Sequence, residues 1–199
     1  MRKMTAAAVL FLGLGLSAFL PGIMEACVGK TIYLGRMPGT EQEILAELFV
    51  WLVSERTGTS IEVKPFPDSR SSHSALEKAE IDLYLEEPLV ALQDILGDKG
   101  PGGSGDLRRL VKEEYAERFN LVWLEPWGLA GKSREGVGLS LVAPVVRRDT
   151  LKKFPALSRL VNKMAGVVDD GAMEQMVAES GRKPVREVTK AFLKEKKLI

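Results

Sequence analysis

The sequence predicts an α/β domain with a mainly parallel five-stranded sheet flanked by helices. Short runs rich in β-branched and aromatic residues alternate with stretches of helical periodicity, in the order β-α-β-α-β over the first half of the chain. Right-handed crossovers through the intervening helices make such strands parallel. The length of 199 residues suits one domain of this kind.

The first helix has the most distinctive pattern. Thr40 and Glu43 match a Ser/Thr-x-x-Glu capping box, which predicts that Thr40 caps the helix. Apolar side chains then recur at helical spacing until Gly58, at Ile44, Leu45, Leu48, Phe49, Leu52 and Val53. The other elements predicted in this half are a strand at 30–37, a strand at 61–63, a helix at 74–79 and a strand at 81–84.

The second half begins with a segment that cannot hold a regular element. Residues 97–105 (GDKGPGGSG) predict a flexible loop. Beyond it we expect a helix up to Phe119, a strand at 121–124 and a fifth strand at 137–146, where Pro144 indicates an edge or a bend. Three further helical stretches follow, around 157–164, 173–177 and 185–192.

Composition excludes several classes of function. With 28 Lys and Arg against 27 Asp and Glu, the chain lacks the basic surface that nucleic acids demand. One Cys and one His exclude a disulfide framework and a Cys-based zinc site, and we expect neither a metal nor a cofactor. No nucleophile with an orienting base can be assembled, so an enzyme is not expected.

The N-terminus indicates export. The basic run Met1-Arg2-Lys3-Met4 precedes an apolar stretch at 5–24, as in a secretory signal segment covering residues 1–26. The same stretch is just long enough to cross a bilayer, so an uncleaved anchor stays open. Either alternative exports the predicted domain at 27–199, to the periplasm or to the outer face of the cytoplasmic membrane. Cys27 stands where a lipid-accepting cysteine would follow a signal, although Met24-Glu25-Ala26 is a poor version of that motif, and lipidation also stays open.

Several segments resemble a family of transport proteins. They are Gly35 with Thr40-Glu41-Gln42, Glu80 to Tyr84 (EIDLY), Asn120 to Pro126 (NLVWLEP), and Ala143 to Pro155 (APVVRRDTLKKFP). In this order they resemble the substrate-binding proteins of glycine betaine, choline and carnitine (osmoprotectant) ABC transporters, which commonly read GSKNFTEQ, GEIDLYPEYTGT, YNLVWLDP and APVVRKDVLKKYP. The resemblance implies a type II periplasmic-binding-protein fold, a quaternary-ammonium or zwitterionic solute, and an ABC permease as partner.

The resemblance also implies that one lobe is missing. Family members cross into a second lobe after WLDP and return at APVV, and the ligand is clamped between the two lobes. Only Trp127 to Leu141 separates these motifs here. We therefore expect a single first lobe that cannot capture a ligand by domain closure within one chain.

Five residues are candidate ligand contacts: Arg36, Thr40, Tyr84, Glu87 and Trp127. Arg36 stands next to Met37, which replaces the family's carboxylate-binding Lys, and Glu87 replaces a Tyr of PEYTGT and could attract a cation by charge. Thr40 fits a helix cap as well as a ligand contact, and Tyr84 fits the core as well as the site. Trp127 follows a strand's carboxyl end, where ligands of open α/β sheets bind.

Two further positions are expected to be solvated. Glu86 and Glu87 could form a paired-carboxylate site, but no His and no recognisable acid or base partner stands near them in the sequence. Solvated charges at a helix entry are therefore the favoured interpretation. His73 lies in a Ser-rich segment, and we expect it on the surface.

Two functions follow from these residues and from the resemblance. The first is an extracytoplasmic solute-binding component of an osmoprotectant ABC transporter, truncated to one lobe with a degenerate ligand site. The second is an accessory interaction module that has lost solute binding and docks to a permease or another exported partner. We expect weak or no betaine binding by the isolated chain, because one lobe buries less of a ligand than a clamp does. A homodimer that sets two lobes face to face stays open.

Overall fold

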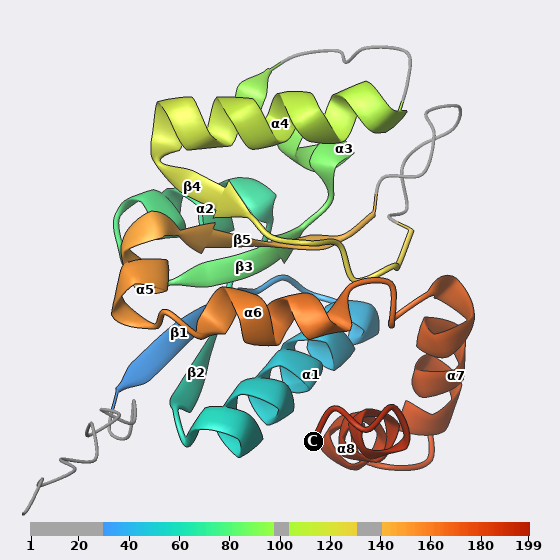
Figure 1. Ribbon diagram of the computed structural model, residues 1–199. Coiled ribbons are helices and arrows are strands. Elements are labelled where there is room, and N and C mark those ends of the chain that lie inside the picture. Colours follow the sequence, from blue (N-terminus) through green and yellow to red (C-terminus); the bar gives the residue numbers. More distant parts are fainter. Residues whose placement is uncertain (1–29, 98–103, 131–140) are drawn as a thin grey trace, which may run out of the picture.

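Five strands form one sheet in the order β2-β1-β3-β5-β4 (Figure 1). The structure is a computed structural model that describes residues 30–97, 104–130 and 141–199. The strands are β1 (Thr31–Arg36), β2 (Ser60–Pro65), β3 (Leu83–Glu86), β4 (Leu121–Trp123) and β5 (Ala143–Arg147). The predicted five-strand α/β architecture is therefore confirmed.

Helices flank this sheet. They are α1 (Thr40–Thr57), α2 (Ser69–Glu77), α3 (Pro88–Val90), the π-helix η1 (Ala91–Leu96), α4 (Ser104–Phe119), α5 (Arg148–Lys153), α6 (Leu157–Val161), the 3₁₀ helix η2 (Asn162–Met164), α7 (Asp170–Ser180) and α8 (Val185–Glu195). Helix α2 begins five residues before the predicted start, at Ser69, because Asp68 caps it by accepting the amide of Ser71 at 2.7 Å.

The sheet is mixed rather than purely parallel, because one of its strands, β5, runs against both of its neighbours. β1 pairs in parallel with β2 and β3, whereas β5 is antiparallel to both β3 and β4. A parallel neighbour requires a crossover connection, usually through a helix. The chain instead turns back from β4 and re-enters the sheet beside it as β5, which inverts the strand direction.

Beyond the ends of β4 and β5 the backbone stays paired, between residues 127–130 and residues 141–142. We call this pair of segments the neck. The amide of Trp127 donates to the carbonyl of Val142 at 3.0 Å, and the amide of Val142 donates to Leu129 at 2.9 Å. The neck ends in an antiparallel bridge between Ala130 and Leu141. Segments on either side of residues 131–140 are therefore neighbours.

Pro144 lies inside the sheet rather than at its edge. β5 is flanked by β3 and β4, with Pro144 opposite Leu85. The carbonyl of Pro144 still accepts the amide of Leu124 at 2.9 Å, so the missing N–H does not prevent pairing. The predicted fifth strand begins at Ala143 instead of 137, and residues 137–140 lie outside the described residues.

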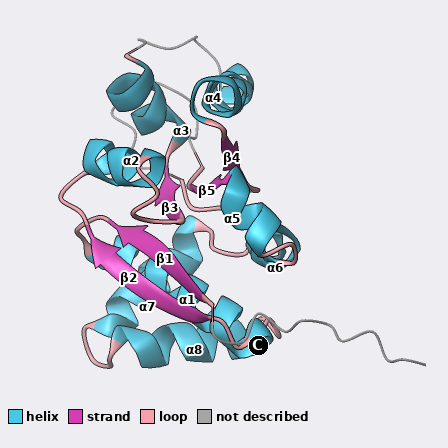
Figure 2. Cartoon of the chain, turned by 90° about the vertical axis from the view of Figure 1, so that its left-hand side faces the viewer, coloured by secondary structure: helices cyan, strands magenta, loops and turns pink. Residues whose placement is uncertain are grey.

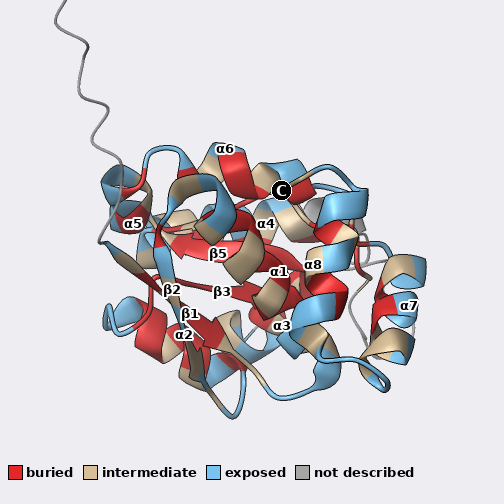
Figure 3. Cartoon of the chain, turned by 90° about the horizontal axis from the view of Figure 1, so that it is seen from below, coloured by how far each residue is buried: buried red, intermediate tan, exposed pale blue. Residues whose placement is uncertain are grey.

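Two apolar cores lie on the two faces of the sheet (Figures 1 and 2). Leu83 and Leu85 of β3 pack into the core with α1, α6, α7 and α8, whereas Tyr84 packs into the core with α2, η1 and α4. This alternation follows the two-residue period of a strand. Strands β3 and β5 are buried between the helices (Figure 3).

Three predictions fall partly or wholly outside the described residues. The signal segment at 1–26 and Cys27 lie there, as do residues 98–103 of the predicted flexible loop. The end of that predicted loop is helical, because α4 begins at Ser104.

Candidate functional site

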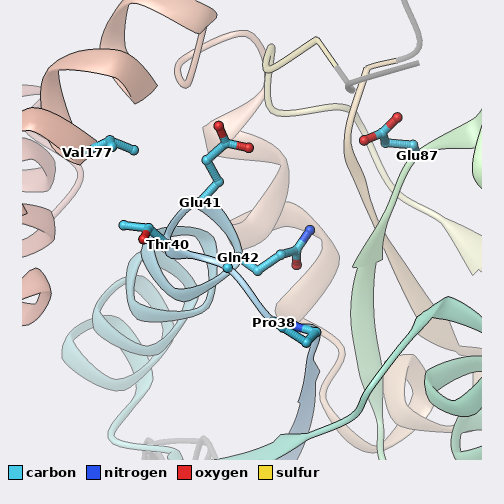
Figure 4. Close-up of a pocket in the computed structure, with 7 residues that line it drawn as sticks. Pro38, Thr40, Glu41, Gln42, Glu87 and Val177 are labelled. Atoms are coloured by element: carbon cyan, nitrogen blue, oxygen red, sulfur yellow. The ribbon is translucent and has the colours of Figure 1, made fainter. Parts of the chain in front are cut away.

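A concave site of about 420 Å³ lies where β1 and β3 end. Its lining residues are Pro38, Gly39, Thr40, Glu41, Gln42, Glu87 and Val177. The first five connect β1 to the start of α1, Glu87 follows β3, and Val177 belongs to α7 (Figure 4). Ligands of open α/β sheets bind at the carboxyl ends of the strands, which is the edge that carries this site.

Gly39 forms the turn that leads into α1 in the lining of the site. Its φ angle of 114° lies in the region that favours glycine, and the amide of Glu43 donates to its carbonyl at 3.0 Å. Thr40 is already the first helical residue, and no side chain caps α1. The predicted capping box is therefore wrong: the turn at Gly39 begins the helix one residue early, and Thr40 lines the site instead.

The charge of the lining is negative. Glu41 and Glu87 supply carboxylates, Thr40 and Gln42 supply neutral polar groups, and no basic side chain belongs to the described lining. Arg36 lies outside this lining and forms an ion pair with Glu43, with Nη1 and Oε2 3.9 Å apart. Coulomb attraction therefore favours a cationic ligand at this site.

Glu86 holds the neighbouring backbone of Glu87 in place. Its Oε1 accepts the Glu87 amide at 2.8 Å, and its Oε2 accepts the hydroxyl of Ser69 from α2. Only 2% of Glu86 is exposed, and burial raises the pKa of its carboxyl to about 8. The expectation that Glu86 is a solvated charge is wrong, because the strand period turns it to the same face as Tyr84.

His73 is also buried, which corrects its expected place on the surface. The early start of α2 turns it inward, where its Nδ1 lies 3.4 Å from the hydroxyl of Tyr84. Its ring packs edge-on against Tyr115 and Phe119 of α4, with ring centroids 5.1 Å and 4.6 Å apart. Burial lowers the pKa of His73 to about 4, so the imidazole is neutral near pH 7.

Thr40 and Glu87 are the two predicted contacts that the fold brings together in this site. Tyr84 and Trp127 are fully buried, and neither belongs to the lining. The indole Nε1 of Trp127 has no hydrogen-bond partner among the described residues. As ligand contacts, Arg36, Tyr84 and Trp127 stay predictions.

Five other lining residues are not among the contacts that the sequence predicts: Pro38, Gly39, Glu41, Gln42 and Val177. Glu41 and Gln42 belong to the Thr40-Glu41-Gln42 motif, which could have indicated them. Val177 comes from α7, ninety residues after Glu87, and no local pattern relates the two.

The described ranges hold neither a metal cluster nor a membrane-spanning helix. In 30–97, 104–130 and 141–199, no three His, Cys, Asp or Glu side chains gather as metal ligands would. None of the helices in these ranges combines the length and apolar character needed to cross a bilayer.

Comparison with known sequences identifies relatives of this chain. The family described as the substrate binding domain of ABC-type glycine betaine transport system matches residues 30–137 and 117–195. The carnitine transport binding protein OpuCC of Listeria monocytogenes is 25% identical over 168 residues, which are 80% of this chain and 51% of OpuCC. The chain thus spans about half the length of the curated relatives that it matches.

Solved structures share the fold. A glycine betaine/carnitine/choline ABC transporter structure matches with a TM-score of 0.77 at 12% identity, covering 85% of this chain and 98% of that chain. Apo YehZ from Escherichia coli matches with a TM-score of 0.72 at 13% identity, covering 85% of this chain and 99% of that chain. The family match extends over most of the residues from 30 onward, and the chain belongs to the family of substrate-binding domains of ABC-type glycine betaine transport systems.

Proposed function

We propose that this chain is an extracytoplasmic solute-binding component of an ABC transporter, and that the concave site at the ends of β1 and β3 receives a quaternary-ammonium solute. The observation that carries this proposal is the lining itself, in which Glu41 and Glu87 provide the charge. A permease is then the partner, and residues 1–26 are the export or anchoring segment.

The lining favours choline over glycine betaine. Both solutes carry a trimethylammonium group, which the two carboxylates attract. Betaine also carries a carboxylate, and the described lining offers it no basic side chain. Repulsion between like charges therefore weakens betaine binding relative to choline.

Binding is expected to be weak. No aromatic ring belongs to the described lining, so the cation–π attraction that quaternary ammonium groups use elsewhere is not supplied there. The site is also open on one side, and it leaves more of the ligand in water than a two-lobed clamp would.

Calorimetric titration of residues 28–199 with choline, glycine betaine, carnitine and proline tests the proposal. We expect saturable choline binding in the millimolar range, and weaker betaine binding. Glu87→Gln removes one carboxylate and should weaken choline binding roughly 10-fold. Glu174→Gln is the matched control, because Glu174 is exposed on α7 outside the lining.

One observation favours the second candidate function, an accessory module without solute binding. Tyr84 and Trp127, the aromatic residues predicted for the site, are both buried outside its lining. If none of the four solutes binds at millimolar concentration, or if Glu87→Gln and Glu174→Gln bind choline equally, the solute-binding proposal fails. Capture of a permease by the chain without solute would then support the accessory role.

A further inference from the structure

A second concavity lies at the opposite end of α1 from the candidate site. It encloses about 190 Å³ and is lined by Arg56, Thr57, Ala156, Arg159, Leu160 and Lys163. These residues come from the last turn of α1, from α6 with the residue before it, and from η2. Helix α1 has 18 residues and is about 27 Å long, and the two concavities lie at its opposite ends.

Three cations converge on this second concavity, which we call the cationic pocket. No carboxylate belongs to its described lining. Within the described ranges, Arg159 and Lys163 form no ion pair and no side-chain hydrogen bond. Arg56 is oriented by its Nε, which donates to the carbonyl of Leu198 at 2.7 Å.

Stabilisation of the carboxyl end of α1 explains only one of these three cations. A single cation in the last turn stabilises a helix carboxyl end, and Arg56 fills that role for α1. Adding Arg159 and Lys163 beside it brings like charges together, which raises the electrostatic free energy of the empty pocket. An anion in the pocket would relieve that repulsion.

The segment that supplies Arg159 and Lys163 is rich in basic residues. Residues 147–163 carry six basic side chains and one acidic side chain, in a chain whose formal net charge is only +1. The one acidic side chain, Asp149, is already paired with Lys152 at 3.0 Å. Positive charge is therefore concentrated on α5, α6 and η2, and Arg148, Lys152 and Lys153 of α5 are exposed.

These basic residues lie where the N-terminal segment joins the domain. Thr31, the first residue of β1, pairs with Ser60, three positions after Thr57 of the pocket. Two views place α5 on the same side of the molecule as the start of β1 (Figures 1 and 3). The residues before Lys30 include the apolar stretch at 5–24, for which the sequence predicts a signal segment or a membrane anchor.

We propose that this edge of the domain faces a membrane surface, and that the cationic pocket of Arg56, Arg159 and Lys163 binds the phosphate group of an anionic phospholipid. Arginine and lysine near a bilayer are attracted to anionic headgroups, and each such charge is worth about fivefold in affinity. Arginine also offers two parallel N–H donors to phosphate oxygens.

Amide hydrogen exchange of the full chain tests this proposal. The chain is compared on nanodiscs of phosphatidylcholine alone and on nanodiscs in which part of that lipid is replaced by phosphatidylglycerol. We expect amides at 53–59 and 156–164 to exchange at least about fivefold more slowly on the anionic discs, and this protection to fade as salt is added. Amides around Gly39 and Glu87 should exchange equally on both.

The double variant Arg159→Gln with Lys163→Gln should lose the protection on anionic discs. The double variant Arg182→Gln with Lys183→Gln is the matched control, because these exposed cations lie in the α7–α8 turn. Equal exchange on the two kinds of disc overturns the proposal, as does an equal loss of protection in both variants. Protection by inorganic phosphate on phosphatidylcholine discs, without any effect of phosphatidylglycerol, also overturns it, because the pocket would then hold a free anion.

Discussion

Asp82 connects three parts of the fold through one carboxylate. Its Oδ2 accepts the amide of Tyr33 in β1 at 2.9 Å, and its Oδ1 accepts the hydroxyl of Thr150 in α5 at 2.7 Å. Arg147 at the end of β5 adds an ion pair, with Nη1 and Oδ1 3.8 Å apart. The motif Glu80-Ile81-Asp82-Leu83-Tyr84 therefore carries a structural residue.

Asp82→Ala should lower the free energy of unfolding by about 2–4 kcal/mol, because it leaves the Tyr33 amide and the Thr150 hydroxyl without their acceptor. Asp82→Asn should cost only about 1 kcal/mol, since its carbonyl can accept the amide while its NH₂ group donates to the hydroxyl. Urea unfolding measures both. Equal losses in the two variants would contradict this role for the carboxylate oxygens.

Glu86 and His73 give the stability of the protein a defined pH dependence. The pKa of Glu86 is raised by burial from 4.5 to about 8, so its contribution is present at low pH and is lost as the pH rises toward 8. The pKa of His73 is lowered by burial from 6.5 to about 4, so its contribution is present above 6.5 and is lost as the pH falls toward 4. Between pH 4.5 and pH 6.5 the two residues change the free energy of unfolding in opposite directions. Above pH 6.5 only Glu86 still changes it.

We therefore expect the free energy of unfolding to fall between pH 6.5 and pH 8, by at most about 1.4 kcal/mol per pH unit. Glu86→Gln should abolish this fall, because a buried amide does not titrate. Glu113→Gln, on the exposed face of α4, should leave it intact. Urea midpoints at the two pH values provide the measurement, and a flat wild-type profile would contradict it.

For individual side chains, the sequence predicts the type of chemistry better than it predicts whether the side chain is buried. It predicts Thr40 and Glu87 as candidate contacts, and both line the site. It predicts Glu86 and His73 in water, and both are buried. Composition favours exposed charges in general, whereas burial here depends on the start of α2 and on which face of β3 each side chain joins.

The start of α1 depends on a single backbone conformation. Gly39 has φ at 114°, and a Cβ placed there would meet no atom within 4 Å. Gly39→Ala should therefore lower the free energy of unfolding by about 1–3 kcal/mol, through backbone strain rather than through a steric clash. Choline binding should also weaken in this variant, because the strained residue directly precedes Thr40, Glu41 and Gln42, which line the site.

Gly181→Ala is the matched control for this prediction. Gly181 ends α7 with φ at −68°, which any residue adopts, and its added Cβ would lie at an ordinary 3.6 Å from the Ala178 carbonyl. The melting temperature of Gly39→Ala should lie below that of Gly181→Ala, because only the first variant strains the backbone. Equal stability would mean that α1 can begin without the turn at Gly39.

Most elements could be predicted, because their signals are local. The apolar spacing from Ile44 to Val53 and the break at Gly58 match α1, which ends at Thr57. The direction of β5 could not be predicted in this way. Strand direction depends on where the chain re-enters the sheet, and the pairing across the neck joins residues that no periodicity relates.

The whole chain should keep its dimensions when ligand binds. The described strands form a single sheet with the concave site at its edge, so closure of two lobes is not expected within this chain. Small-angle scattering should give the same radius of gyration with and without saturating choline. Contraction on binding would contradict a one-lobed mechanism, and a doubling of mass in light scattering would instead indicate a site completed by a second copy.

The neck also makes the molecule a suitable host for protein engineering. Ala130 and Leu141 face each other as an antiparallel pair, which places their Cα atoms about 4.5–5.5 Å apart. A guest domain whose own termini lie close together could replace residues 131–140 without stretching the ladder between β4 and β5. A guest domain inserted at this point should therefore leave the host sheet folded.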